Sequence, residues 1–333
     1  MTDARLNLLT NYVKEVWPQS AGAEFKLLNG DASLRRYFRV KGRIAVDAPP
    51  ESQKTAEFVD IATRLTQMGV RVPKIYAADV KQGLMLIEDV GDRVFAGAAQ
   101  WTEQERYYLK AAALLPQLAV TRSSGLPHFD KAFMLQELEI MRQWLLQQAL
   151  GMTLTDAEEQ VVRTAFEVLT TEIERLPYCT MHRDFHCRNL QVLLDESLCV
   201  LDFQDMVVGP CGYDVASLVY DCYVMLPQAL VDKLLALTWR RYIALGLIHV
   251  DLATFSAQVQ LISLQRHLKV LGIFNRLYLR DGKRGYLRDL PRVLTYTLKE
   301  CAILPELQDF SHFMHERVAP TLNAYLQREG IKA

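Results

Sequence analysis

Three oxygen-bearing side chains near the middle of the chain have a spacing that could support chemistry. Asp184 stands five residues before Asn189, and Asp202 follows thirteen residues later, after a short apolar hairpin. Phosphoryl transfer requires a metal ion on the nucleotide phosphates and an acceptor hydroxyl aimed in line with the phosphorus atom. A carboxylate can take the proton of that hydroxyl, and Mg²⁺ prefers carboxylate and amide oxygens. The spacing therefore predicts an ATP- and Mg²⁺-dependent phosphotransferase.

The roles follow from comparison with the protein-kinase catalytic loop, H-R-D-L-x-x-x-N followed by D-F-G. We predict that Asp184 is the catalytic base and that Asn189 and Asp202 are metal ligands; the simpler alternatives are loop-capping or turn residues. His182 and Arg183 precede the base. We expect structural roles for both, with His182 packing under the loop and Arg183 pairing with a nearby carboxylate.

Composition restricts the class of protein. The 333 residues are half hydrophobic and carry a formal net charge of −1. This balance gives no electrostatic reason to expect a nucleic-acid or membrane partner. No apolar run approaches the roughly 18 residues of a membrane span, and the N-terminus lacks the pattern of a signal peptide. The six cysteines include no C-x-x-C pair. We therefore expect a cytoplasmic protein with reduced thiols, and nothing in the sequence requires more than a monomer.

The first part of the chain has β-type patterns around one helix. We predict a helix over 6–16, strands over 25–28, 37–41, 43–47, 72–77 and 84–88, and a helix from about 51 to 68 that begins after Pro49-Pro50.

The composition becomes helical after Trp101. The apolar periodicity predicts helices over 103–120, 130–149, 155–176, 214–225, 228–246, 251–271, 287–303 and 306–327. The only strand-like interruption is a hairpin over 191–201. We therefore predict an α+β protein with a nucleotide-binding lobe over 1–90 and a helical lobe over 91–333, which carries the catalytic loop and the acceptor site.

Taken together, the chain resembles the aminoglycoside phosphotransferase and choline kinase family over nearly its whole length. The resemblance implies a bilobal, protein-kinase-like fold with a small β-sheet N-lobe and a larger helical C-lobe. It also implies ATP as co-substrate and Mg²⁺ as cofactor. Asp214 resembles the family residue that ties the catalytic loop to the next helix, although it could also be a plain helix N-cap.

Two further stretches resemble the bacterial kinases of this family that act on amino sugars in cell-wall recycling. They are Gly30–Arg39 with Val46–Pro50, and Gln265–Phe274. The resemblance implies phosphorylation of the anomeric C1 hydroxyl of N-acetylmuramate, N-acetylglucosamine or both. The open alternatives are another acceptor, such as an aminoglycoside, choline or a different sugar, and a non-catalytic pseudokinase.

Two segments are predicted to bind ATP. The turn over 29–36 should cover the phosphates, since glycine allows close backbone approach and hydroxyl and N–H groups can cradle them. Its candidate residues are Gly30, Asp31, Ala32, Ser33 and Arg35. The backbone of Glu88 and Val90 should bind adenine, as a kinase hinge does; the alternative is an ordinary buried strand end.

One position departs from the kinase pattern. The third strand usually carries a lysine that pairs with the phosphates and with a helix glutamate, but here Asp47 occupies that position. Either the register of this strand is shifted, or Arg43, Arg35 or Lys54 replaces the cation; the partnership with Glu57 is then in doubt too.

The acceptor region is locally basic. Between Gln265 and Arg292 eight Lys or Arg residues face only two Asp residues. Such a region disfavours a polycationic antibiotic and suits an anionic acceptor such as N-acetylmuramate, although it could also be a solvated helix face. Four residues are candidate substrate contacts: Asp205, Arg266, His267 and Lys269. Asp205 could equally lie beside the metal or be solvated.

Overall fold

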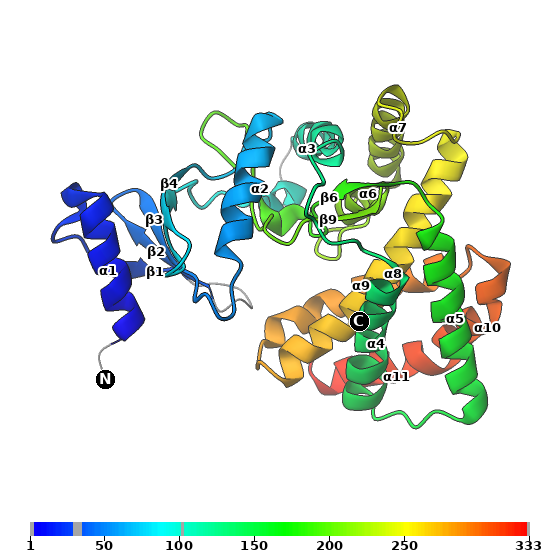
Figure 1. Ribbon diagram of the computed structural model, residues 1–333. Helices are drawn as coiled ribbons and strands as arrows, with labels where there is room; N and C mark the ends of the chain where they lie inside the picture. The colour runs from blue at the N-terminus through cyan, green and yellow to red at the C-terminus, as the bar shows by residue number, and fades with distance from the viewer. Residues whose placement is uncertain (1–2, 29–34, 101–102, 332–333) are drawn as a thin grey trace. The chain divides into compact units, whose positions relative to one another are not determined.

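The computed structural model describes residues 3–28, 35–100 and 103–331. The chain forms two compact units, Met1–Gly97 with Arg188–Met206, and Ala98–Cys187 with Val207–Ala333. The first unit contains a small antiparallel sheet and the second is mainly helical (Figure 1). The predicted α+β class is thus confirmed. The two contact units divide at residue 97, and the segment 188–206 groups with the first unit.

The sheet of the first unit has five antiparallel strands in the order β1-β2-β3-β5-β4. The strands are β1 (Lys26–Leu27), β2 (Arg36–Val40), β3 (Arg43–Asp47), β4 (Ile75–Asp79) and β5 (Leu84–Glu88). Strands β3 and β5 have the bounds predicted from the sequence. Lys41 and Gly42, both with positive φ, form the tight turn between β2 and β3.

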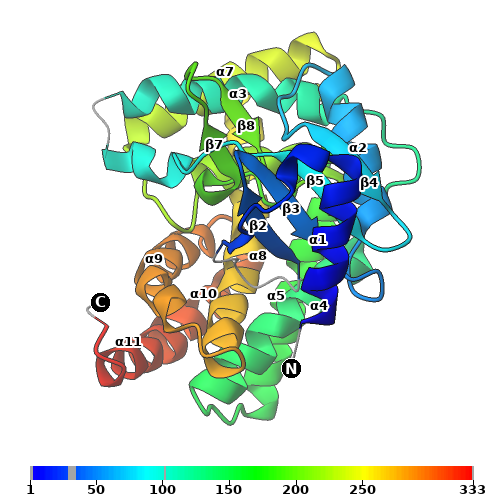
Figure 2. The same cartoon turned by 90° about the vertical axis from the view of Figure 1, so that its left-hand side faces the viewer.

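Helix α1 (Ala4–Val16) covers one face of this sheet (Figure 2). Its buried Leu9 and Val13 pack with alternate strand residues such as Phe38 and Leu86. Helix α2 (Thr55–Gln67) begins later than predicted. The backbone N–H groups of Ser52 and Gln53 bond to the carbonyl of Pro49, so these residues form a turn before the helix.

The predicted central hairpin also belongs to the first unit. Strand β7 (Leu190–Val192) pairs with β8 (Leu198–Val200) through a turn in which Glu196 has a φ of 61°. Because Leu190 lies opposite Val200, the residues just outside the ladder, Asn189 and Leu201, are brought together. The carbonyl of Asn189 accepts the Leu201 N–H at 2.8 Å.

The second unit is built around helix α8 (Leu252–Leu279). Every residue from Leu261 to Lys269 is buried, so the helix is enclosed on all sides. The other α-helices of this unit are α3 (Gln104–Ala119), α4 (Lys131–Ile140), α5 (Asp156–Glu174), α6 (Tyr213–Val219), α7 (Gln228–Ala244), α9 (Leu290–Glu300), α10 (Gln308–Phe313) and α11 (Ala319–Arg328). Among the described residues, no helix is long and apolar enough to span a membrane.

A second two-stranded ribbon was not predicted. Strand β6 (Tyr178–Met181) pairs with β9 (Val207–Pro210), so the expectation of a single strand-like interruption is wrong. A Cβ atom at Gly209 would lie 2.6 Å from Sδ of Met181, so any larger residue there would displace the end of that side chain. Helix α6 is also shorter than predicted, because the chain turns at Asp221, whose carboxylate accepts the Tyr223 N–H at 2.7 Å.

Candidate functional site

The candidate catalytic loop of the second unit follows strand β6. The buried carboxylate of Asp214, in the first turn of α6, accepts the backbone N–H groups of His182 and Arg183 at 2.6 and 3.0 Å. At the far end of the loop, the buried Asp221 carboxylate accepts the Cys187 N–H at 2.8 Å. Two carboxylates therefore hold the backbone on either side of Asp184, and each one satisfies N–H groups that would otherwise be orphaned.

Arg183 lies in the left-handed region, with a φ of 75°. This conformation is costly for a residue with a side chain and is kept only where surrounding contacts determine it. The Arg183 guanidinium lies 2.8 Å from the carboxylate of Glu137 on α4 and over the Phe133 ring. Ion pairing and stacking thus fix the residue next to the candidate base.

Glu137 is buried and gathers three donors. Besides Arg183, it accepts Lys269 Nζ at 2.7 Å and Gln265 Nε2 at 3.1 Å, both from α8. Sequence reasoning missed this residue, which belongs to no motif. Its one signal is a charge among the buried positions Met134 and Leu138 of the same helix.

The electrostatics of this loop favour an ionised Asp184. Burial alone would raise the pKa of its carboxyl group, but nearby positive charges, above all that of Lys269, outweigh this effect and lower the pKa to about 2. Burial also lowers the pKa of His186. Asp184 therefore carries a negative charge at neutral pH and can accept a proton or orient a hydroxyl group.

The candidate metal residues lie in the first unit. The β7–β8 hairpin places Asn189 directly across from Leu201, which precedes the exposed Asp202. Gln204 Nε2 donates to Oδ1 of Asp202 at 2.9 Å. An amide oxygen and a carboxylate are hard donors, and Mg²⁺ usually takes one or two such ligands together with substrate phosphates. The donor set therefore fits Mg²⁺.

The predicted ATP contacts can be located only in part. Gly30, Asp31, Ala32 and Ser33 lie outside the described residues. Arg35 is buried at 4% exposure and donates to Oε1 of Gln204 at 3.1 Å. The Glu88 side chain pairs with Arg71, and the Glu88 N–H bonds to the Lys74 carbonyl. Val90 is half-buried just beyond β5.

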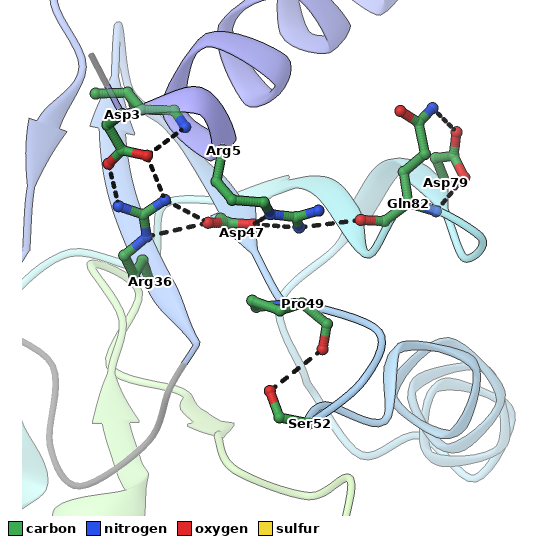
Figure 3. A network of polar contacts seen from close by, with 9 residues as sticks. Asp3, Arg5, Arg36, Asp47, Pro49, Ser52, Asp79 and Gln82 are labelled. Atoms are coloured by element: carbon green, nitrogen blue, oxygen red, sulfur yellow. Dashed lines mark hydrogen bonds and ion pairs between the residues drawn. The ribbon is translucent and has the colours of Figure 1, made fainter. Parts of the chain in front are cut away.

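Asp47, which occupies the position of the usual lysine, is fully buried in β3. Its carboxylate pairs with Arg36 on β2 and with Arg5 on α1, and Arg36 also pairs with Asp3 (Figure 3). Asp47 thus joins α1 to the sheet. A lysine at this position would face the guanidinium groups of Arg5 and Arg36.

The three basic candidates for that cation have different surroundings. Arg43 is held between the rings of Trp17 and Tyr76, at 4.2 and 4.1 Å. Lys54 forms a partly exposed ion pair of 3.0 Å with Asp205. Of these three candidates, Arg35 is the one whose side chain is buried.

The predicted acceptor contacts also differ in their surroundings. Both ring nitrogens of His267 have protein partners, Glu300 and Ser263 at Nδ1 and the Tyr220 carbonyl at Nε2, so the structure gives no support for a substrate contact by this ring. The charge of Lys269 is balanced by Glu137. Asp205 belongs to the first unit, whereas the other three candidates lie on α8.

Arg266 differs from the other three predicted acceptor contacts. It is 3% exposed and lies over the ring of Tyr213, at 5.4 Å. Its Nη1 atom has no hydrogen-bond partner in the part of the chain that the structure describes. A buried guanidinium N–H group without an acceptor is costly, so Arg266 is a candidate anion contact.

A small sheet, a helical unit and a loop with an ionised aspartate are the features of a small-molecule phosphotransferase with a protein-kinase-like fold. Residues 24–251 match the model of the phosphotransferase enzyme family. The chain belongs to this family, as its sequence resemblance indicated.

Curated relatives are similar over almost the full length. The chain is 33% identical to the N-acetylmuramate/N-acetylglucosamine kinase of Pseudomonas putida, with 94% of this chain and 97% of the relative covered. It is also 33% identical to the kinase of the same name from Pseudomonas aeruginosa, with 91% of each chain covered.

Solved structures support the fold. An ADP-bound aminoglycoside phosphotransferase matches with a TM-score of 0.60 at 15% identity, covering 90% of this chain and 99% of the other. A choline/ethanolamine kinase family protein from Mesorhizobium loti matches with a TM-score of 0.61 at 14% identity, covering 93% of this chain and 99% of the other.

Proposed function

We propose that the protein transfers the γ-phosphoryl group of ATP to the anomeric C1 hydroxyl of N-acetylmuramate and N-acetylglucosamine, in peptidoglycan recycling. The observation that carries the proposal is 33% identity, over more than 90% of each chain, to kinases named for these two sugars. We place the enzyme in the cytoplasm as a monomer.

The chemistry is an in-line displacement. The sugar O1 forms a bond to the γ-phosphorus, the bond from that phosphorus to the β,γ-bridging oxygen breaks, and ADP leaves with the electron pair. The ionised Asp184 orients the hydroxyl and accepts its proton. Asn189 and Asp202 would hold Mg²⁺, which when bound neutralises charge on the phosphates. His182, Arg183 and Asp214 support the loop.

Nucleotide recognition is proposed for the first unit. The segment with Gly30, Asp31, Ala32, Ser33 and Arg35 would cover the phosphates, and the backbone at Glu88 and Val90 would bind adenine. Within the helical unit, Arg266 is the proposed contact for the lactyl carboxylate of N-acetylmuramate. Its support is the buried Nη1 atom of Arg266, for which the described residues provide no acceptor.

The test is a turnover assay with Mg·ATP and one acceptor at a time: N-acetylmuramate, N-acetylglucosamine, glucose, choline or kanamycin. Phosphorus NMR of each product locates the new phosphate. A 1-phosphate formed only from the N-acetylated sugars is expected. Turnover of glucose, choline or kanamycin instead would overturn the acceptor assignment, and absence of turnover with every acceptor would overturn the proposed activity.

A further inference from the structure

Gln204 lies between a buried cation and two carboxylates of the first unit. Its Oε1 atom accepts Arg35 Nη1 at 3.1 Å. Its Nε2 atom donates to Oδ1 of Asp202 at 2.9 Å and to Oδ2 of Asp205 at 3.1 Å. One amide group thus connects Arg35 to the candidate metal ligand Asp202.

The chemistry of the amide sets its direction. A guanidinium group only donates hydrogen bonds, so the side facing Arg35 must be the amide oxygen. The NH₂ group then faces the carboxylates, which only accept when ionised. The amide of Gln204 thus satisfies both neighbours at once, with its oxygen toward Arg35 and its NH₂ group toward the carboxylates.

The arrangement leaves one oxygen of Asp202 available. Oδ1 is held by Gln204. The side chain is exposed, and in the part of the chain that the structure describes Oδ2 accepts no hydrogen bond. Metal-binding carboxylates are commonly oriented in this way by a hydrogen bond to the non-ligating oxygen.

Asp205 has a different role from Asp202. Its Oδ1 atom forms an ion pair with Lys54 at 3.0 Å, and its Oδ2 atom accepts Gln204. Both oxygens have protein partners, so Asp205 helps to hold the amide.

We infer that Gln204 and Arg35 are positioning residues for Asp202: Arg35 orients the amide of Gln204, which presents Oδ2 of Asp202 to a divalent cation. The inference rests on the proposed metal role of Asp202. A direct Arg35–Asp202 ion pair would cancel the charge that attracts the metal. An intervening neutral amide transmits orientation and leaves the full charge on Asp202.

The test measures divalent-cation binding directly, with Mn²⁺ as the probe. Electron paramagnetic resonance of free Mn²⁺ in the presence of ADP gives the Kd of the metal. For Gln204→Leu we expect Mn²⁺ affinity to fall about 10- to 100-fold, while metal-free ADP binding changes less than about twofold. Gln67→Leu, on the exposed end of α2, is the matched control.

A double-mutant cycle tests the connection to Arg35; it is measured with every variant saturated by ADP, because Arg35 is also a proposed phosphate contact. If Arg35 acts through Gln204, Arg35→Met combined with Gln204→Leu should weaken Mn²⁺ binding no more than the stronger single change. Gln204→Asn keeps the amide but shortens its reach, and we expect a loss similar to that of Gln204→Leu. If Gln204→Leu fails to fold, this variant is used in its place.

Two outcomes would overturn the inference: parental Mn²⁺ affinity in the folded Gln204 variants, or additive losses in the cycle. A parent protein that binds no Mn·ADP would instead overturn the proposed metal function. The two failures are therefore distinguishable.

Discussion

The buried carboxylate of Glu137 forms an ion pair with the partly buried guanidinium of Arg183, at 2.8 Å. The two residues come from different elements, helix α4 and the candidate catalytic loop. Glu137 also holds Lys269, the largest contributor to the low pKa of Asp184. One buried carboxylate therefore governs both the backbone and the electrostatics of the loop.

For Glu137→Gln we expect a loss of stability of about 3 kcal/mol, because two cations lose their buried counter-charge. Urea unfolding measures this loss. Glu139→Gln, an exposed position on the same helix, is the control and should change stability by less than about 0.5 kcal/mol. Equal losses of stability for Glu137→Gln and Glu139→Gln would show that the ion pairs of Glu137 have no special role in stability.

Asp184→Ala should lower kcat by roughly 10²- to 10⁴-fold, because the acceptor hydroxyl loses its proton acceptor. Mg·ADP affinity should stay near the parental value. Asp202→Ala should instead weaken Mg·ADP binding as well as turnover. Steady-state kinetics and calorimetric titration separate these effects, and comparable turnover by Asp184→Ala would refute the assignment of the base.

The pKa of Asp184 leads to a prediction about pH. A folded-state pKa of about 2 lies below the ordinary value of 3.8, so ionisation of Asp184 stabilises the fold above about pH 4. That contribution is lost as the pH falls toward 2. Across the same range above about pH 4, protonation of Asp184 should not limit kcat/KM.

Lys269→Met should raise the pKa of Asp184, because a positive charge that favours the carboxylate is removed. The acid limb of the kcat/KM profile should then move to higher pH. Lys299→Met, an exposed change on α9, should leave the profile unchanged. An acid limb that stays in place for Lys269→Met would contradict the electrostatic account.

Arg266→Met should discriminate between the two proposed sugars. Loss of a charged hydrogen bond to the lactyl carboxylate should raise KM for N-acetylmuramate by about 10- to 100-fold. KM for N-acetylglucosamine, which lacks that group, should change little. Arg288→Met, on the exposed surface, is the control. An equal rise for both sugars would mean that Arg266 does not read the carboxylate.

Asp47→Asn should destabilise the protein by about 1 to 3 kcal/mol, because Arg5 and Arg36 lose their shared buried acceptor. Thermal unfolding measures this change. Asp60→Asn alters an ion pair on α2 whose carboxylate is half-exposed, and it should have a much smaller effect. Equal shifts in melting temperature for the two variants would refute a stabilising role for the network around Asp47.

The sequence by itself determined the features that depend on residues close together in the chain, namely strand bounds and motif spacing. The bounds of β3 and β5 follow from short runs of strand-forming residues and the turns beside them, and the structure reproduces them. The spacing of Asp184, Asn189 and Asp202 lies within one short stretch, so the kinase-like pattern and the family could be predicted.

The tertiary structure decided which side chains from distant parts of the chain contact one another. Glu137 meets Arg183 across 46 residues, and Arg35 meets Gln204 across 169. Strands β6 and β9 also pair across a long separation. Such contacts leave no local periodicity or turn signal, because each is set by how whole elements pack. The local sequence thus specifies the reactive groups. Packing specifies the residues that hold these groups in place and set their electrostatic surroundings.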